Sequence, residues 1–124
     1  MPGELILIVE DNEKNLKLAR DVLTFHGFRT IEATTAEAGI DLARQQQPDL
    51  ILMDIQLPGM DGVAALAALR ADDATRDLPA VAVTAFAMKE DRERFLAAGF
   101  LGHIVKPLDI KAFPQQVREF CEGR

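Results

Sequence analysis

The chain has 124 residues, of which 48% are apolar, so it is long enough for one domain with a hydrophobic core. A net charge of −6 and the lack of Trp and Tyr disfavour direct binding to nucleic acid, which depends on basic side chains and stacking aromatics. The single Cys, the lack of a long apolar run and the absence of a basic leader predict a soluble cytoplasmic protein with no membrane insertion.

Short apolar runs alternate with helical patterns five times, which is typical of a parallel α/β sheet. Because crossovers between parallel strands are right-handed, few topologies remain. The sequence predicts a flavodoxin-like (βα)5 three-layer sandwich with strand order 2-1-3-4-5. We expect residues 1–124 to form a single domain, with no second domain to carry an output. The predicted strands cover residues 5–9, 29–33, 50–53, 80–83 and 102–105.

Capping signals place the first two helices. Asn12 is a good N-cap for a helix that extends to about residue 25. Thr34 with Glu37 has the spacing of a capping box, and Pro48 follows the end of the second helix. The buried faces predicted for these helices are Leu16, Ala19 and Leu23, and then Ala36, Ile40 and Ala43.

The later helices are less regular. Asp61 can cap the third helix, and the fourth helix, over 89–98, has a poor apolar face formed mainly by Phe95 and Leu96. Pro114 leaves two alternatives for the last helix, which either begins near this residue or is kinked there. The predicted buried faces are Val63, Leu66 and Leu69 in the third helix, and Ile110, Phe113, Val117 and Phe120 in the last.

Polar side chains follow four of the predicted strands. Glu10 and Asp11 follow the first strand, Asp54 the third, Thr84 the fourth and Lys106 the fifth. Ligands of such sheets bind at the carboxyl edge of the strands, where these groups would meet. Three carboxylates and one ammonium sum to −2, a charge that one Mg²⁺ would balance. The residues therefore suit a divalent cation and a phosphoryl group, whereas the alternative is a set of solvated loop acids.

Over essentially its whole length, the chain resembles the receiver domains of two-component response regulators. Three stretches are also similar to the DivK-type single-domain regulators of bacterial cell-cycle signalling, at residues 8–12, 49–58 and 81–89. The motifs that carry the receiver resemblance are Glu10-Asp11-Asn12, the run from Asp54 through Pro58 to Gly62, Thr84-Ala85 and Lys106-Pro107.

The resemblance implies a phosphorylation site with a bound metal. Asp54 would accept a phosphoryl group from a phosphohistidine, and Asp54, Glu10 and Asp11 would hold Mg²⁺. Glu10 would act through water, and the backbone carbonyl of Gln56 would complete the protein ligands. Because Asp54 is a carboxylate nucleophile, the product would be an acyl phosphate.

The resemblance also implies the phosphoryl contacts and the switch. Lys106, Thr84 and Ala85 would bind the phosphoryl group, and the bond between Lys106 and Pro107 would be cis. Thr84 would move toward the added charge. The family usually has Tyr or Phe three residues before the lysine, where this chain has His103. His103 is therefore either a rotating switch or a half-buried residue that fills space.

The implied partners are a sensor histidine kinase or a histidine phosphotransfer protein, and a downstream protein. The downstream protein would dock on the face formed by the fourth helix, the fifth strand and the last helix. We interpret Phe86-Ala87-Met88 as a further contact patch and Cys121 as a small core residue. The protein would be a monomer or a weak dimer, and its only chemistry would be its own phosphorylation and slow autodephosphorylation.

Three alternatives remain at this point. An aspartyl phosphatase would need an acid two residues after its nucleophile, where this chain has Gln56. In a flavodoxin-like electron carrier, Glu10 and Asp11 would repel the flavin phosphate. A constitutive receiver-like binding module would not need the intact Asp54, Thr84 and Lys106.

Overall fold

The computed structural model describes residues 3–85 and 88–123. A five-stranded parallel sheet has the strand order β2-β1-β3-β4-β5, as predicted. The strands are β1 (Leu5–Val9), β2 (Arg29–Ala33), β3 (Leu50–Asp54), β4 (Ala80–Thr84) and β5 (His103–Val105). The helices are α1 (Glu13–Phe25), α2 (Ala36–Gln46), α3 (Gly62–Ala71), α4 (Lys89–Ala98) and α5 (Phe113–Glu122).

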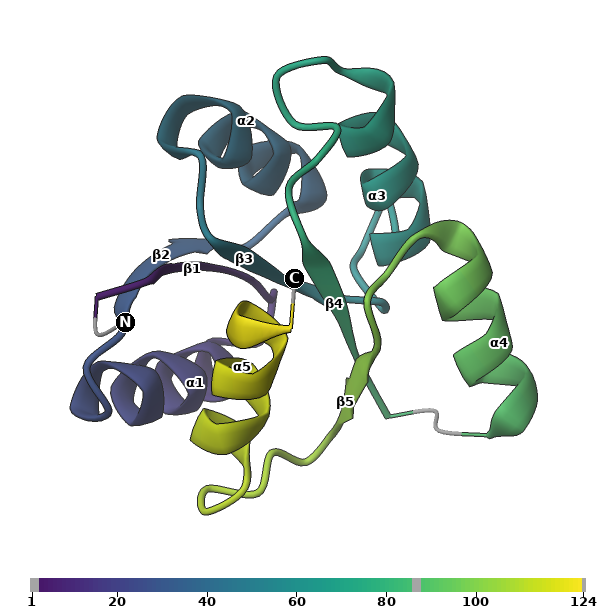
Figure 1. Ribbon diagram of the computed structural model, residues 1–124. Coiled ribbons are helices and arrows are strands. Elements are labelled where there is room, and N and C mark those ends of the chain that lie inside the picture. The colour runs from purple at the N-terminus through teal and green to yellow at the C-terminus, as the bar shows by residue number, and fades with distance from the viewer. Residues whose placement is uncertain (1–2, 86–87, 124) are drawn as a thin grey trace.

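Two hydrophobic clusters lie on opposite faces of the sheet. One face packs against α1 and α5, and the other packs against α2, α3 and Phe95 of α4 (Figure 1). Every residue of β3 and β4 is buried, which is expected of central parallel strands covered by helices on both faces. The predicted three-layer sandwich is therefore confirmed. None of the described helices is both long and apolar enough to span a bilayer.

Two predicted caps are confirmed and the third is wrong. Asn12 Oδ1 and Asp61 Oδ1 accept hydrogen bonds from backbone amides in the first turns of α1 and α3. At α2, however, the cap is Thr35, whose Oγ1 accepts from the Ala38 amide at 3.1 Å, and not Thr34. Because α2 begins one residue later than expected, Glu37 is the second helical residue and cannot complete a capping box.

The buried face of α4 is narrower than predicted. Phe95 is only 1% exposed, whereas Leu96 is 56% exposed. Successive residues of a helix point in different directions, so both side chains could not enter the same core. In α2, similarly, Gly39 is buried and Ile40 is only partly buried. Gly39 allows a close approach of α2 to β1, because a Cβ atom there would lie 2.7 Å from Val9 Cγ2.

The last helix begins at Phe113 and has Pro114 in its first turn, which settles the alternatives left by the sequence. Proline is tolerated there because the first amides of a helix have no partner within it. Ile110 therefore lies outside α5 and is exposed, contrary to the prediction. Cys121 is buried as predicted, while Phe120 is only partly buried.

Candidate functional site

The acidic site lies where β1 and β3 end side by side. Val9 of β1 pairs with Met53 of β3, so Glu10 and Asp54 follow at the same edge of the sheet. One carboxylate oxygen from each of Glu10, Asp11 and Asp54 lies within 4.8 Å of the other two. Glu10 and Asp54 are buried and Asp11 is exposed, so this cluster has a buried floor and an open side.

Lys106 enters the same cluster from the end of β5. Its Nζ atom lies 3.0 Å from Glu10 Oε1 and 2.9 Å from Asp54 Oδ2. The Lys106 backbone amide donates to the Thr84 carbonyl at 2.8 Å, and the bond to Pro107 is cis. One ammonium group thus bridges two buried carboxylates.

Backbone amides hold the other oxygens of both carboxylates. The Asn12 amide donates to Glu10 Oε2 at 3.2 Å, and the Gln56 amide donates to Asp54 Oδ1 at 3.0 Å. Each buried carboxylate therefore has one oxygen on a backbone amide and one on Lys106. This pairing fixes the orientation of both groups before any ligand arrives.

Gly62, at the start of α3, allows the helix to approach the Asp54 backbone closely. A Cβ atom at Gly62 would lie 2.5 Å from the Asp54 carbonyl oxygen and 2.9 Å from Ile55 Cα. The Gly62 amide also donates to the Ile55 carbonyl at 3.0 Å. The loop between Asp54 and α3 can hold this shape only with glycine at that position.

The site has a shortage of positive charge. Burial raises the pKa of Glu10, and the neighbouring Asp54 carboxylate adds to this effect; Lys106 and the Asn12 amide offset it in part, and the pKa reaches about 7. Burial lowers the pKa of Lys106, but its contacts with Asp54 and Glu10 outweigh burial and raise that pKa. The site therefore favours a further cation.

The donor set fits Mg²⁺. Carboxylate oxygens are the ligands that hard divalent cations prefer, and the cluster contains no His or Cys side chain that would favour a softer metal. Because Mg²⁺ keeps several of its waters, the open side at Asp11 also suits it.

The remaining predicted residues lie around this centre. Thr84 is buried at the end of β4, where the strand register places it opposite Val105, the residue before Lys106. Ala85 and Gln56 are exposed, and His103 is half-buried at the start of β5. Of the predicted patch at residues 86–88, only Met88 falls within the described residues, and it is exposed.

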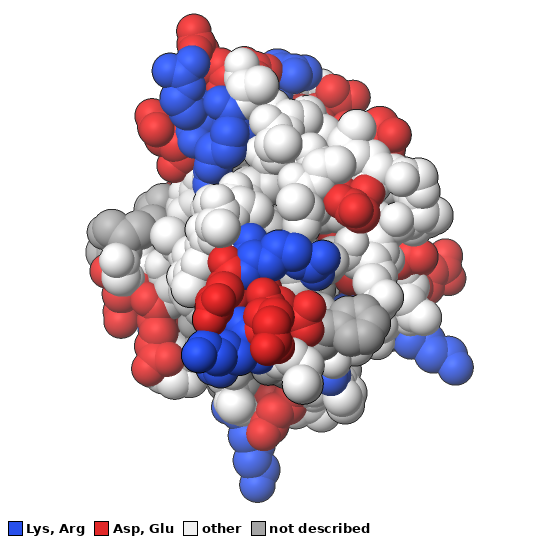
Figure 2. Space-filling view, turned by 90° about the vertical axis from the view of Figure 1, so that its right-hand side faces the viewer, with Lys and Arg blue, Asp and Glu red and all other residues white. Residues whose placement is uncertain are grey.

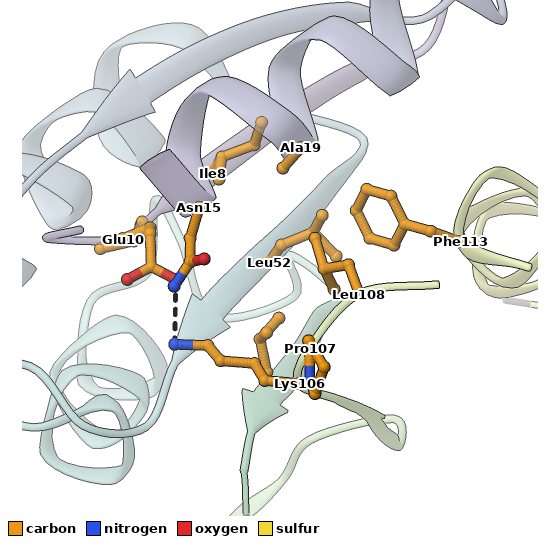
Figure 3. Close-up of a pocket in the computed structure, with 11 residues that line it drawn as sticks. Ile8, Glu10, Asn15, Ala19, Leu52, Lys106, Pro107, Leu108 and Phe113 are labelled. Carbon is orange, nitrogen blue, oxygen red and sulfur yellow. Dashed lines mark ion pairs between the residues drawn. The ribbon is translucent and has the colours of Figure 1, made fainter. Parts of the chain in front are cut away.

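Asn15 was not among the predicted site residues, yet it lines a small cavity beside the site. The cavity has a volume of about 30 Å³ and is bounded by Glu10, Lys106 and a set of apolar side chains (Figure 3). Asn15 stands three residues after the Asn12 cap, so it lies on the same turn of α1. This spacing alone does not single out Asn15, because only its neighbours in space show that it lies beside the site.

Comparison with known proteins agrees with this geometry. Residues 6–118 match the response regulator receiver domain family. The chain is 44% identical over 115 residues to the polar-differentiation response regulator DivK of Brucella anthropi, which covers 93% of this chain and 94% of that protein. DivK of Brucella ovis is similar to the same extent.

Solved structures show the same fold. The receiver domain of the sensor histidine kinase PA1611 from Pseudomonas aeruginosa PAO1, with a magnesium ion coordinated in its active site cleft, has a TM-score of 0.87. It is 32% identical to this chain, and the match covers 97% of this chain and 98% of that one. The Vibrio cholerae chemotaxis protein CheY4 matches in fold at a TM-score of 0.89, with 20% identity and coverage of 95% and 98%.

A parallel sheet of this order, with an acidic cluster and a lysine at its carboxyl edge, defines a phosphorylation-dependent signalling domain of two-component systems. The chain belongs to the response regulator receiver domain family and is similar to DivK.

Proposed function

We propose that Asp54 accepts a phosphoryl group from the phosphohistidine of a sensor histidine kinase or a histidine phosphotransfer protein. The observation that carries this proposal is the ion pair between Lys106 Nζ and the buried Asp54 Oδ2 at 2.9 Å. In the reaction an Asp54 oxygen attacks phosphorus, and the P–N bond breaks as the P–O bond forms. The imidazole nitrogen keeps the electron pair and takes up a proton. The product is an acyl phosphate on Asp54.

Glu10, Asp11 and Asp54 would hold Mg²⁺, together with the backbone carbonyl of Gln56. The clustered carboxylate oxygens and the magnesium ion in the related PA1611 domain support this assignment. When bound, the metal neutralises charge on the transferred phosphoryl oxygens. The protein's own part is to keep Asp54 fixed and oriented through the Gln56 amide and Lys106.

Lys106, Thr84 and Ala85 would bind the phosphoryl oxygens. Phosphorylation raises the negative charge at Asp54 to roughly −2, which attracts the ammonium and the hydroxyl. The Lys106 backbone amide donates a hydrogen bond to the Thr84 carbonyl, so a shift of the backbone at one residue would also shift the other. His103 is half-buried at the start of β5. It can either respond to that movement or fill space. Pro107 would keep the Lys106 loop in place.

The output would be protein binding on the face formed by α4, β5 and α5. A groove of about 410 Å³ runs between α4 and β5. Figure 2, which faces the side where α4 lies, shows charges of both signs gathered in one area with uncharged surface around them. The groove is lined by Lys89, Arg92, Glu93, Leu96, Leu101, Gly102 and His103.

We propose further that the chain acts as one receiver domain, as a monomer or weak dimer, and that it turns over no separate substrate. Its chemistry would be limited to its own phosphorylation and slow autodephosphorylation. We place this exchange in the cytoplasm, because a chain with a single cysteine, Cys121, forms no internal disulfide and suits a reducing compartment.

Phosphorylation from a small donor tests the proposal. Incubation with Mg²⁺ and acetyl phosphate should add the mass of one phosphoryl group, and peptide mapping should place it on Asp54. Asp54→Asn should remove the label, whereas the matched control Asp41→Asn, at an exposed acid of α2, should keep it. A label that persists on Asp54→Asn would refute the assignment. Steady hydrolysis of phosphate esters would instead support a phosphatase.

A further inference from the structure

The side-chain amide of Asn15 is poised beside the site but unused. Asn15 is half-buried in the first turn of α1, and within residues 3–85 and 88–123 its side chain has no hydrogen-bond partner. It lines the same small cavity as Glu10 and Lys106, and Figure 3 shows its amide directed toward these two side chains. A polar group in this position has very few possible partners.

The chemistry of the cavity narrows the choice to two. Among the residues that the structure describes, Asn15 is the only uncharged polar side chain that lines the cavity. Apart from Glu10 and Lys106, the lining side chains are apolar, and they include Leu52 and Phe113. Among the described side chains of this lining, the amide can therefore donate to the Glu10 carboxylate or accept from the Lys106 ammonium. The cavity and the small Ala19 beside it leave room for the amide to turn.

Phosphorylation creates a need for such a partner. In the described state, Lys106 Nζ is shared between Glu10 Oε1 at 3.0 Å and Asp54 Oδ2 at 2.9 Å. A phosphoryl group on Asp54 would draw the ammonium toward its oxygens. Glu10 Oε1 would then lose the ammonium that contacts it directly while Glu10 stays buried, and a buried carboxylate oxygen that loses its direct hydrogen-bond donor is unfavourable. The Asn12 amide cannot compensate, because it already bonds to the other oxygen, Oε2.

We propose that Asn15 is a positioning residue that donates a hydrogen bond from its side-chain amide to Glu10 Oε1 when Lys106 turns to the phosphoryl group on Asp54. The exchange keeps the Glu10 carboxylate oriented in the phosphorylated state. Asn15 therefore stabilises the phosphorylated state and not the unphosphorylated one, because its hydrogen bond to Glu10 forms only after Lys106 has moved. This inference rests on the proposed phosphorylation of Asp54 and extends it to the residue that supports the active state.

The test compares two binding reactions in Asn15→Leu, which keeps the side-chain size and removes the amide. Beryllofluoride with Mg²⁺ mimics the phosphoryl group, and its binding can be followed by calorimetry or by amide NMR shifts. Asn15→Leu should weaken beryllofluoride binding about tenfold, as expected for one hydrogen bond to a charged group. Its affinity for Mg²⁺ alone should stay as in the unmodified chain, because Lys106 still serves Glu10 there.

Three controls make the result specific. Gln45→Leu removes an exposed amide from α2, far in sequence from the site, and should change neither reaction. In a Glu10→Gln background, the effect of Asn15→Leu should become smaller than tenfold, since the neutral Gln oxygen is a weaker acceptor than a carboxylate. Asn15→Ser, which retains a shorter donor, should recover part of the loss. If Asn15→Leu does not fold, the comparison of Asn15→Ser with Asn15→Ala decides the same question.

Equal beryllofluoride binding by Asn15→Leu and the unmodified chain would overturn the inference, and so would an equal loss in both reactions. Neither result would contradict the proposed phosphorylation of Asp54. That proposal fails separately, if the unmodified chain binds no beryllofluoride or if Asp54→Asn binds it equally well.

Discussion

The ammonium of Lys106 lies 2.9 Å from Oδ2 of Asp54, so the proposed phosphoacceptor is paired with a cation before any ligand arrives. The same ammonium also contacts Glu10, so that among the described residues Lys106 is the only ion-pair partner of both buried acids. Lys106 therefore has two roles that can be separated: it stabilises the metal-free fold, and it is poised for the phosphoryl group.

Removal of Lys106 should reveal its structural role. Lys106→Met would leave two carboxylates buried without a cation, and should lower the free energy of unfolding by about 2 kcal/mol in metal-free buffer. The loss should shrink when Mg²⁺ is added, because the metal replaces the missing charge. Urea unfolding followed by circular dichroism, with chelator and then with excess Mg²⁺, measures both. Lys89→Met, at an exposed lysine of α4, is the matched control. An equal loss with and without Mg²⁺ would contradict this account.

The raised pKa of Glu10 gives the metal-free protein a distinct pH dependence. Its pKa is about 7 in the folded state against 4.5 for an ordinary Glu carboxyl, so between these pH values the folded protein binds more protons than the unfolded chain. Glu10 therefore contributes its full stabilisation of the fold below a pH of about 4.5. This contribution to the free energy of unfolding should be lost as the pH rises through about 7.

Urea unfolding in chelator over this range, for the unmodified chain and for Glu10→Gln, isolates the effect. The difference between the two proteins should grow with pH, since Gln stays neutral throughout. Carboxyl groups elsewhere with lowered pKa values, such as Asp21 and Asp72, cancel in the comparison. A difference that does not change with pH would mean that Glu10 titrates normally.

The fold could be predicted from the sequence because each strand carries a local signal. The runs that became β1 and β3 are apolar at nearly every position, and only a doubly covered parallel sheet buries such strands on both faces. The charged site followed from the same step, because parallel strands end at one edge. The predicted positions of Glu10, Asp54 and Lys106 at that edge depended on no side-chain detail.

What the sequence could not predict depended on register within a helix. The periodicity of α2 permits a start at either of two threonines, and only packing against β1 chooses between them. For α4, neither Phe95 nor Leu96 is favoured by the weak apolar pattern, so the burial of Phe95 had to come from the structure. Asn15 was missed because a single polar residue on a helix gives no signal until its neighbours in space are known.

The two threonines before α2 give a direct test of that register. Thr35→Ala removes the oxygen that accepts from the Ala38 amide and should cost about 1 kcal/mol of the free energy of unfolding. Thr34→Ala, at an exposed neighbour with no capping role, should change it by less than about 0.5 kcal/mol. Urea denaturation midpoints of the two variants are sufficient. A larger loss for Thr34→Ala would restore the capping box that the spacing with Glu37 suggested.

Gly62 should link the packing of α3 to the chemistry of Asp54. In Gly62→Ala the new methyl would lie 2.5 Å from the Asp54 carbonyl oxygen, a backbone atom that cannot move without turning the Asp54 side chain. We expect a loss of about 1–3 kcal/mol in the free energy of unfolding, typical of overpacking, and a slower reaction with acetyl phosphate even where the protein is fully folded.

Ala67→Gly, at an exposed position of the same helix, should cost about 1 kcal/mol through helix propensity and leave the phosphorylation rate unchanged. Phosphorylation followed by intact mass, with unfolding curves for both variants, separates stability from positioning. Equal rates in the two variants would show that the Asp54 backbone adapts to the methyl without disturbing the carboxylate.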